Sequence, residues 1–291
     1  MHTIQNEVLK ITVAERGAEL KSITAISDGT EYLFDGDPMW WKFSSPVLFP
    51  IVGKLNGGKY RAEGKEFNLP GHGFARTSNF WLFDATDDTL IFALESNAAT
   101  LKVYPYKFRL EITFKLVGNE VKVFWKVANV DDKEIYFSIG AHPAICCPIA
   151  YRENFDDCYL QFNRAEKSSR ITLTASGTLS HDRIPTIDGT ELALNYDLFK
   201  GDALVFDDLK SDEVTVRSRK SHKSITVRAK NFPDWGFWTP SQGGAPFICI
   251  EPWHGHADYE DFTGELKDKE GIIKLAVGET FETEMDFIIG D

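Results

Sequence analysis

The sequence predicts an all-β protein: a large antiparallel β-sandwich with very little helix, forming a single domain over residues 1–291. Residues 110–116 alternate between apolar and polar side chains, Gly118–Asn119 supplies a turn, and the alternation resumes over 121–127. This pattern predicts a long hairpin with one solvated face. Short β-prone segments separated by turn residues occur throughout, and only residues 192–199 show a helical period.

The remaining elements follow in order along the chain. Two β-prone segments, Val8–Ala14 and Ala18–Ile26, flank Arg16–Gly17, and Asp28–Gly29 supplies a turn before Glu31–Phe34. A hairpin is expected around Gly64. Later strands are predicted at Trp81–Thr86, Thr89–Glu95, Ile135–Ile139, Tyr159–Phe162, Ala203–Phe206, Val214–Arg217 and Ser224–Ala229, with a closing hairpin of Ile272–Leu275 and Thr280–Ile288 around Gly278.

Composition and charge exclude several classes of partner. The formal net charge of -12 argues against nucleic acid and against anionic membrane surfaces. No run approaches the ~20 apolar residues of a membrane helix, and the N-terminus has no signal-peptide pattern. The four cysteines include no Cys-x-x-Cys pair, which is typical of reduced thiols. We therefore expect a cytoplasmic protein with no membrane or nucleic-acid partner; the oligomeric state stays open.

The segment Pro246–Trp253 places one carboxylate, Glu251, in an apolar run bounded by Gly243–Gly244 and Pro252. The run predicts a buried strand with Glu251 at its end. Glutamate is almost never fully buried without a partner, and burial raises its pKa, which suits a general base near neutral pH. The alternative is that Glu251 points outward or caps a turn and has no chemical role.

Two histidines lie in segments where a ligand can approach. His142 follows a predicted strand and precedes Pro143, which should end regular pairing there. His72 lies between two glycines, with Arg76 four residues later. Arg76 is suited to bind a carboxylate or a phosphate, and Lys54 adds a polar group after an apolar run. Each of these residues also has an ordinary structural interpretation when taken alone.

A metal site is the alternative suggested by His254, His256 and Asp258, because alternating histidines with a nearby carboxylate can bind zinc or iron. No distant cluster of ligands accompanies them in the sequence, so we predict no metal. No glycine-rich segment has the context of a phosphate loop, and no Gly-x-Ser-x-Gly motif indicates a serine nucleophile.

Six segments in order resemble the aldose 1-epimerase (mutarotase) superfamily: Gly17–Ile23, Pro50–Lys54, Gly71–Arg76, Gly140–Pro143, Ile250–Trp253 and the closing stretch from Lys269 to Gly278. The resemblance implies a galactose-mutarotase type β-sandwich that interconverts the α and β anomers of a free sugar. It implies Glu251 as the general base that takes the anomeric hydroxyl proton, and His142 as the general acid that protonates the ring oxygen. His72 would hydrogen-bond the sugar.

The resemblance also suggests sugar-binding roles for Arg76, Lys54, Asp202 and Trp238. The chain has Lys54 where galactose mutarotases carry arginine, and Ala141 where they carry asparagine. Its segment Gly71–Arg76, which reads Gly-His-Gly-Phe-Ala-Arg, is more similar to the hexose-6-phosphate mutarotase branch and to the bacterial mutarotase-related branch. The expected substrate is therefore a hexose or a hexose phosphate, with no cofactor. The alternatives are a non-catalytic carbohydrate-binding or sugar-sensing β-sandwich, and the metal-dependent isomerase or lyase that His254, His256 and Asp258 would form.

Overall fold

The computed structural model describes residues 1–290. It confirms the all-β class, since 51% of the chain is strand and 7% is helix, and the helical segments of the described residues are all short 3-10 turns. Within residues 1–290, no helix is long and apolar enough to cross a membrane.

The first half of the chain contains the following strands: β1 (His2–Gln5), β2 (Leu9–Ala14), β3 (Glu19–Ala25), β4 (Val47–Leu48), β5 (Lys59–Ala62), β6 (Lys65–Asn68), β7 (Trp81–Ala85), β8 (Thr89–Glu95), β9 (Phe108–Val117), β10 (Glu120–Asn129), β11 (Ile135–Phe137), β12 (Ile139–Ala141) and β13 (Ala144–Cys146). The second half contains β14 (Cys158–Leu173), β15 (Leu179–Ala193), β16 (Leu204–Phe206), β17 (Glu213–Ser218), β18 (Ser224–Arg228), β19 (Asp234–Trp238), β20 (Phe247–His254), β21 (Ile273–Leu275) and β22 (Thr280–Gly290). The 3-10 turns are η1 (Asn56–Gly58), η2 (Ala75–Thr77), η3 (Thr100–Lys102), η4 (Phe155–Asp157), η5 (Tyr196–Phe199) and η6 (Leu266–Asp268).

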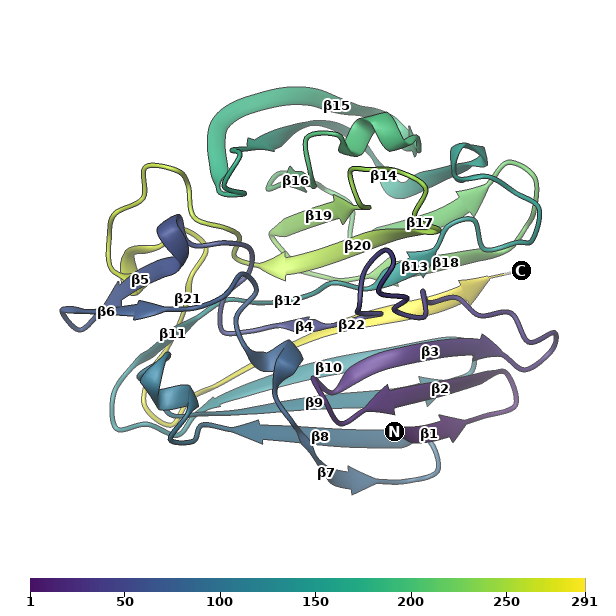
Figure 1. Ribbon diagram of the computed structural model, residues 1–291. Coiled ribbons are helices and arrows are strands. Elements are labelled where there is room, and N and C mark those ends of the chain that lie inside the picture. The colour runs from purple at the N-terminus through teal and green to yellow at the C-terminus, as the bar shows by residue number, and fades with distance from the viewer. Residues whose placement is uncertain (291) are drawn as a thin grey trace.

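One large antiparallel sheet forms most of the molecule. Its order is β4-β12-β20-β19-β16-β14-β17-β18-β22-β10-β9-β8-β7, with β13 on β20 and β15 on β14. A separate sheet of β1–β3 lies beside β8–β10 (Figure 1). Apolar side chains of both sheets, such as Ile11, Ile23, Leu110 and Phe114, belong to one buried cluster. The cluster closes a sandwich, which confirms the predicted architecture.

The predicted hairpin of residues 110–127 is confirmed as β9 and β10. The two strands pair from Glu120↔Val117 to Asn129↔Phe108, and every second side chain is buried on both strands. Gly118, at the turn, has a φ of 57°, a conformation that glycine adopts at little cost. The alternation of apolar and polar residues was sufficient to predict this hairpin because the two strands and their turn are contiguous in sequence.

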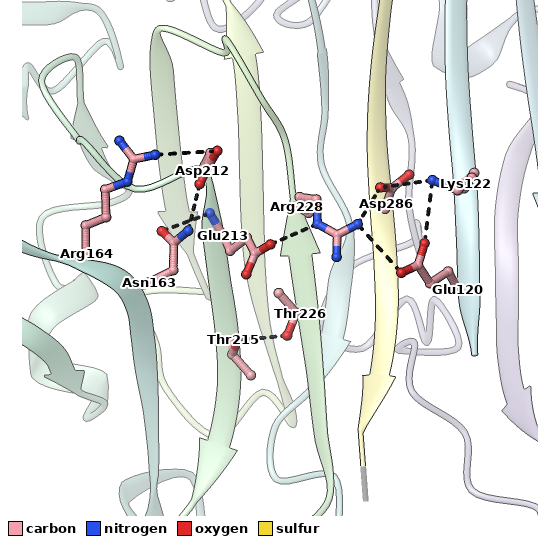
Figure 2. A network of polar contacts seen from close by, with 10 residues as sticks. All are labelled: Glu120, Lys122, Asn163, Arg164, Asp212, Glu213, Thr215, Thr226, Arg228 and Asp286. Atoms are coloured by element: carbon pink, nitrogen blue, oxygen red, sulfur yellow. Dashed lines mark hydrogen bonds and ion pairs between the residues drawn. The ribbon is translucent and has the colours of Figure 1, made fainter. Parts of the chain in front are cut away.

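A network of charged side chains connects four neighbouring strands in the same sheet, β17, β18, β22 and β10 (Figure 2). Arg228 on β18 lies 2.9 Å from Glu213 on β17, 3.2 Å from Asp286 on β22 and 3.6 Å from Glu120 on β10. Lys122 of β10 lies 3.5 Å from the same Asp286. Arg228 and Lys122 are both direct cross-strand partners of Asp286, the geometry in which opposite charges favour one register.

Two expectations about strands were wrong and a third was incomplete. The predicted closing hairpin does not form: β21 pairs with β11, whereas β22 pairs with β10 and β18. The predicted strand Ile135–Ile139 is divided at Ser138, because β11 and β12 have different partners. The predicted strand Tyr159–Phe162 extends to Leu173 and pairs with β15, which was not predicted; most side chains of β15 are exposed and its pairing is bulged, so no alternation marks it.

The loop that carries His72 is held against the segment 49–53. Phe74 N–H donates to Phe49 O at 3.0 Å, and His72 N–H donates to Gly53 O at 2.8 Å. Between them, Gly73 has a φ of +68°, and a Cβ at this position would lie 2.3 Å from Phe49 O. Only glycine permits this approach.

We therefore expect Gly73→Ala to lower the free energy of unfolding by about 2–4 kcal/mol, through the strained φ and the backbone clash. The measurement is urea denaturation. Gly29→Ala is the matched control, because Gly29 has a φ of +75° with nothing within 4 Å of a Cβ. It should cost only about 1–2 kcal/mol from the left-handed backbone alone. Equal losses in the two variants would show that the contact with Phe49 does not matter.

Candidate active site

Glu251 lies inside β20 and not at its end, which corrects the expectation from the sequence. The strand continues through Pro252 to His254. Proline is tolerated because the neighbouring chain on that edge is interrupted between β12 and β13. Ile250 N–H donates across this edge to Pro143 O at 3.3 Å, and alternation places the nitrogen of Pro252 on the same edge. The side chain of Glu251 is buried, with 1% of the residue exposed.

His142 stands opposite Glu251 because of the strand register. Gly140 of β12 is paired with Trp253, and Ala144 of β13 is paired with Cys249. His142 lies midway between these pairs, and Glu251 lies midway on β20, so their side chains share one face. His142 Nε2 lies 3.2 Å from Glu251 Oε2. This contact is not a hydrogen bond, because Glu251 Oε2 has no hydrogen-bond partner within the described chain.

Burial pushes the ionisation of the two groups in opposite directions. Burial, followed by the charge of Asp202, raises the pKa of Glu251 well above its usual range, whereas Arg76 opposes this rise. Burial, followed by His72 and Arg76, lowers the pKa of His142 well below its usual range. Burial therefore favours the uncharged form of each group, a protonated Glu251 beside a neutral His142.

The imidazole of His72 is held in a single tautomer. Gly53 N–H donates to His72 Nδ1 at 3.2 Å, so Nδ1 is the acceptor and the proton of the neutral ring lies on Nε2. Burial, with smaller contributions from Arg76 and Lys54, lowers the pKa of His72 to about 3, so the ring is neutral at physiological pH. The His72 and His142 rings meet edge to face, with centroids 5.4 Å apart. His72 can thus offer an N–H donor beside the acid/base pair.

Arg76 and Lys54 bring positive charge to the same cavity. The guanidinium of Arg76 donates from Nη2 to Gly71 O at 2.7 Å and lies 5.2 Å from the centre of the Phe43 ring. These contacts fix its position, and its charge favours the ionised form of Glu251. The side chain of Lys54 packs on Gly177, where a Cβ would lie 2.7 Å from the ammonium nitrogen.

Aromatic side chains surround His142 and complete the cavity. Trp41 lies against the His142 ring with centroids 4.6 Å apart, and Trp238 meets it edge to face at 5.6 Å. Trp253 crosses Gly140 and Gly236, where a Cβ would approach the indole to within 2.5 Å and 2.4 Å. The cavity contains all the residues predicted from the sequence: Glu251, His142, His72, Arg76, Lys54, Asp202 and Trp238.

Trp41 and Trp253 line this cavity but were not predicted as site residues. Trp253 belongs to the segment that drew attention to Glu251, and its position two residues further along a strand places both side chains on one face. That spacing could have identified Trp253 as a site residue from the sequence. Trp41 follows another tryptophan in an irregular segment, where no period indicates which of the two faces the site.

The histidines considered as metal ligands do not converge. His254 Nε2 lies 3.2 Å from Thr283 Oγ1, and His256 Nδ1 contacts Ala257 O at 2.8 Å. Asp258 receives a 2.8 Å bond from the buried Lys269 ammonium and a 2.9 Å bond from Asn56 N–H, so it anchors the loop after β20.

Among the described residues, one other set has potential metal ligands close together: His142, Cys249 and Glu251, whose ligand atoms lie within 4.8 Å of one another. Imidazole, thiolate and carboxylate are all ligands that zinc accepts. Two members of this set are the proposed acid and base, so metal binding here would compete with proton transfer.

Comparisons with known proteins identify the family of this chain. The family model described as aldose 1-epimerase matches residues 1–274. The chain is 34% identical over 295 residues to the chromosomal protein LacX of Lactococcus lactis subsp. lactis, covering 98% of each chain.

Two solved structures are similar along the whole chain. A galactose mutarotase related enzyme from Lactobacillus acidophilus has a TM-score of 0.94 at 32% identity, covering 100% of this chain and 97% of that one. A galactose mutarotase-like protein from Lactobacillus casei has a TM-score of 0.93 at 31% identity, covering 99% of both chains. Sequence and fold therefore agree, and the chain belongs to the aldose 1-epimerase family.

Proposed function

We propose that this protein is a cofactor-independent aldose 1-epimerase that interconverts the α and β anomers of a hexose or a hexose phosphate. The observation that carries the proposal is the pair formed by Glu251 and His142, buried and facing each other 3.2 Å apart in a polar and aromatic cavity. Family membership supports an isomerase of this type. A sugar-binding module without turnover needs no such matched acid and base.

The geometry suits opening and closing of a hemiacetal ring. The anomeric hydroxyl and the ring oxygen are attached to the same carbon, so two groups 3.2 Å apart can reach both oxygens at once. Glu251 takes the proton of the anomeric hydroxyl while His142 gives a proton to the ring oxygen, and the bond between C1 and the ring oxygen breaks. Rotation about the C1–C2 bond turns the aldehyde, and the reverse proton transfers close the ring on either face.

The proton count of the pair is compatible with these roles. A protonated Glu251 beside a neutral His142 contains the same number of protons as a carboxylate beside an imidazolium. Transfer of one proton from the Glu251 carboxyl to the His142 imidazole converts the first form into the second; the positive charge of Arg76 favours the carboxylate and disfavours the imidazolium. The second form has the base and the acid that ring opening needs.

Other residues of the cavity hold the sugar and stabilise charge. The Nε2–H of His72 is available to a sugar oxygen near the reacting carbon. Asp202 can accept hydrogen bonds from hydroxyls at the cavity wall, and Trp238 and Trp41 offer ring faces for the apolar side of a pyranose. Lys54 and Arg76 supply the positive charge that a phosphorylated hexose would need.

Anomer exchange followed by NMR tests the proposal directly. Freshly dissolved α-glucose, α-galactose and their 6-phosphates should equilibrate faster with protein than with buffer, and protein treated with EDTA should be equally active. We expect no metal dependence because acid/base catalysis typically gives about 10²–10⁴-fold, which suffices for a reaction that proceeds unaided in water. Equilibration no faster than in buffer for every sugar would contradict the proposal. A loss on chelation that zinc restores would instead assign a metal to His142, Cys249 and Glu251.

A further inference from the structure

The thiol of Cys249 lies beside the acid/base pair because of the period of the strand. Cys249 and Glu251 are two residues apart on β20, so their side chains point to the same face of the sheet. One ligand atom each of Cys249, Glu251 and His142 lies within 4.8 Å of the other two, and all three residues are buried. A thiol, a carboxyl and an imidazole therefore meet at the wall of the catalytic cavity, which Glu251 and His142 line.

The proposed reaction leaves this thiol without a role. Ring opening needs one base and one acid, which Glu251 and His142 supply. Cys249 is a fully buried free cysteine, and its sulfur makes no hydrogen bond within the described residues. Glu251 also keeps a free acceptor, because its Oε2 has no hydrogen-bond partner within residues 1–290. A buried carboxylate oxygen without a partner costs free energy, and a bound cation would remove that cost.

The distances suit a zinc ion. Zinc binds nitrogen and oxygen at about 2.0–2.2 Å in a tetrahedral arrangement, which sets two such ligands about 3.3 Å apart. His142 Nε2 and Glu251 Oε2 are 3.2 Å apart. The bond from zinc to sulfur is about 2.3 Å, so the sulfur of Cys249 should lie about 3.5 Å from each of the other two ligand atoms. Its separation of at most 4.8 Å exceeds this value by about 1.3 Å or less, an adjustment that a side-chain rotation supplies.

The ligand set selects zinc over the hard cations. Thiolate and imidazole suit zinc, whereas magnesium and calcium prefer oxygen ligands. The thiolate of Cys249 and the carboxylate of Glu251 balance the two charges of the ion, and the protons that the thiol and the carboxyl carried leave to the solvent. Arg76 and Lys54, which line the same cavity, oppose a cation. We therefore expect zinc to bind reversibly here and not as a resident structural ion.

We propose that His142, Cys249 and Glu251 form an inhibitory zinc site. The proposal rests on the proposed epimerase function and adds a regulation of the same site. A zinc ion bound to the imidazole and the carboxylate occupies the lone pairs that would otherwise take and pass on protons. The ion also occupies the space that C1 of the sugar and its two oxygens need during ring opening. Zinc and sugar therefore exclude one another.

NMR anomer exchange of glucose at increasing zinc concentration tests the proposal. We expect zinc to raise the apparent KM of glucose and EDTA to restore the original rate, whereas magnesium at the same concentration should have no effect. Cys249→Ala should raise the zinc concentration for half-inhibition by about tenfold or more and leave kcat/KM without zinc within about twofold. Cys147→Ala is the matched control, because Cys147 is an equally buried free cysteine that does not line the cavity. It should be inhibited by zinc like wild type.

A spectroscopic measurement separates metal binding from activity. Cobalt(II) in place of zinc should give a sulfur-to-metal charge-transfer band with wild-type protein, because cobalt accepts the same thiolate and imidazole ligands. Cys249→Ala should lack this band, and Cys147→Ala should keep it. Cys249→Ser, which keeps the size of the side chain, takes the place of Cys249→Ala if alanine unfolds the protein.

Three results would contradict the zinc site. The first is zinc inhibition of equal strength in wild type and Cys249→Ala, or none in either. The second is faster exchange on addition of zinc, which would make the ion a catalytic metal. The third is inhibition by magnesium as strong as that by zinc. If no sugar is exchanged, the proposed function fails, but the cobalt band and equilibrium dialysis of zinc with wild type and Cys249→Ala still decide the site. Equal zinc binding to both proteins would then reject it.

Discussion

Replacing Glu251 with Gln should remove almost all acceleration of anomer exchange, lowering kcat/KM by about 10²–10⁴-fold. The amide has nearly the shape of the carboxyl but cannot take the proton of the anomeric hydroxyl. The fold should tolerate the change, because burial raises the pKa of Glu251 and the site already favours an uncharged side chain. The measurement is NMR exchange for glucose and galactose together with urea denaturation.

Stability gives an independent check on this variant. A carboxyl whose pKa is raised in the folded protein costs stability as the pH rises above its unfolded pKa. Glutamine has no such cost, so Glu251→Gln should be at least as stable as wild type at neutral pH. Asp234→Asn is the matched control: Asp234 is a buried carboxyl on neighbouring β19, burial raises its pKa to about 6, and it lies outside the cavity. It should keep its activity. A fully active Glu251→Gln protein would show that another group is the base.

The sequence was sufficient for elements whose signal is local. The β9–β10 hairpin was predicted because its alternation, turn and return lie in one continuous segment. The predicted closing hairpin had the same kind of signal around Gly278, yet β21 pairs with β11, with Ile135 opposite Leu275. A turn residue indicates where a strand ends, but a partner so remote in sequence is chosen by the packing of the whole sandwich.

The candidate site was predictable as a set of segments but not as a geometry. The segments around His72, His142 and Glu251 were recognised one by one. That His142 faces Glu251 follows from the register of β12 and β13 against β20, which no local pattern contains. The break between β12 and β13 also explains why Pro252 does not end the strand. Trp41 could not be preferred to Trp40, because the choice depends on how an irregular loop packs on His142.

Replacing His142 with Asn should lower kcat/KM by about 10²–10⁴-fold with little change in KM, since the amide retains polarity but cannot give a proton to the ring oxygen. His72→Asn provides the comparison. His72 is neutral, because burial lowers its pKa to about 3, and its proposed role is to donate a hydrogen bond that asparagine can partly replace. The loss of kcat/KM in His72→Asn should be smaller than in His142→Asn, and more of it should come from an increase in KM.

The double variant Glu251→Gln/His142→Asn then distinguishes a coupled pair from two independent groups. If one proton shared across 3.2 Å serves both steps, either substitution alone disables the pair, and the double variant should be no slower than the worse single variant. The losses from two independent groups would instead multiply.

The pH dependence follows from the same proton count. Activity should fall on the acid side, where the pair takes a second proton against the lowered pKa of His142, and on the alkaline side, where Glu251 loses its proton despite its raised pKa. Multiplicative losses, or a wild-type profile with a single limb, would show that Glu251 and His142 do not act as one acid/base unit.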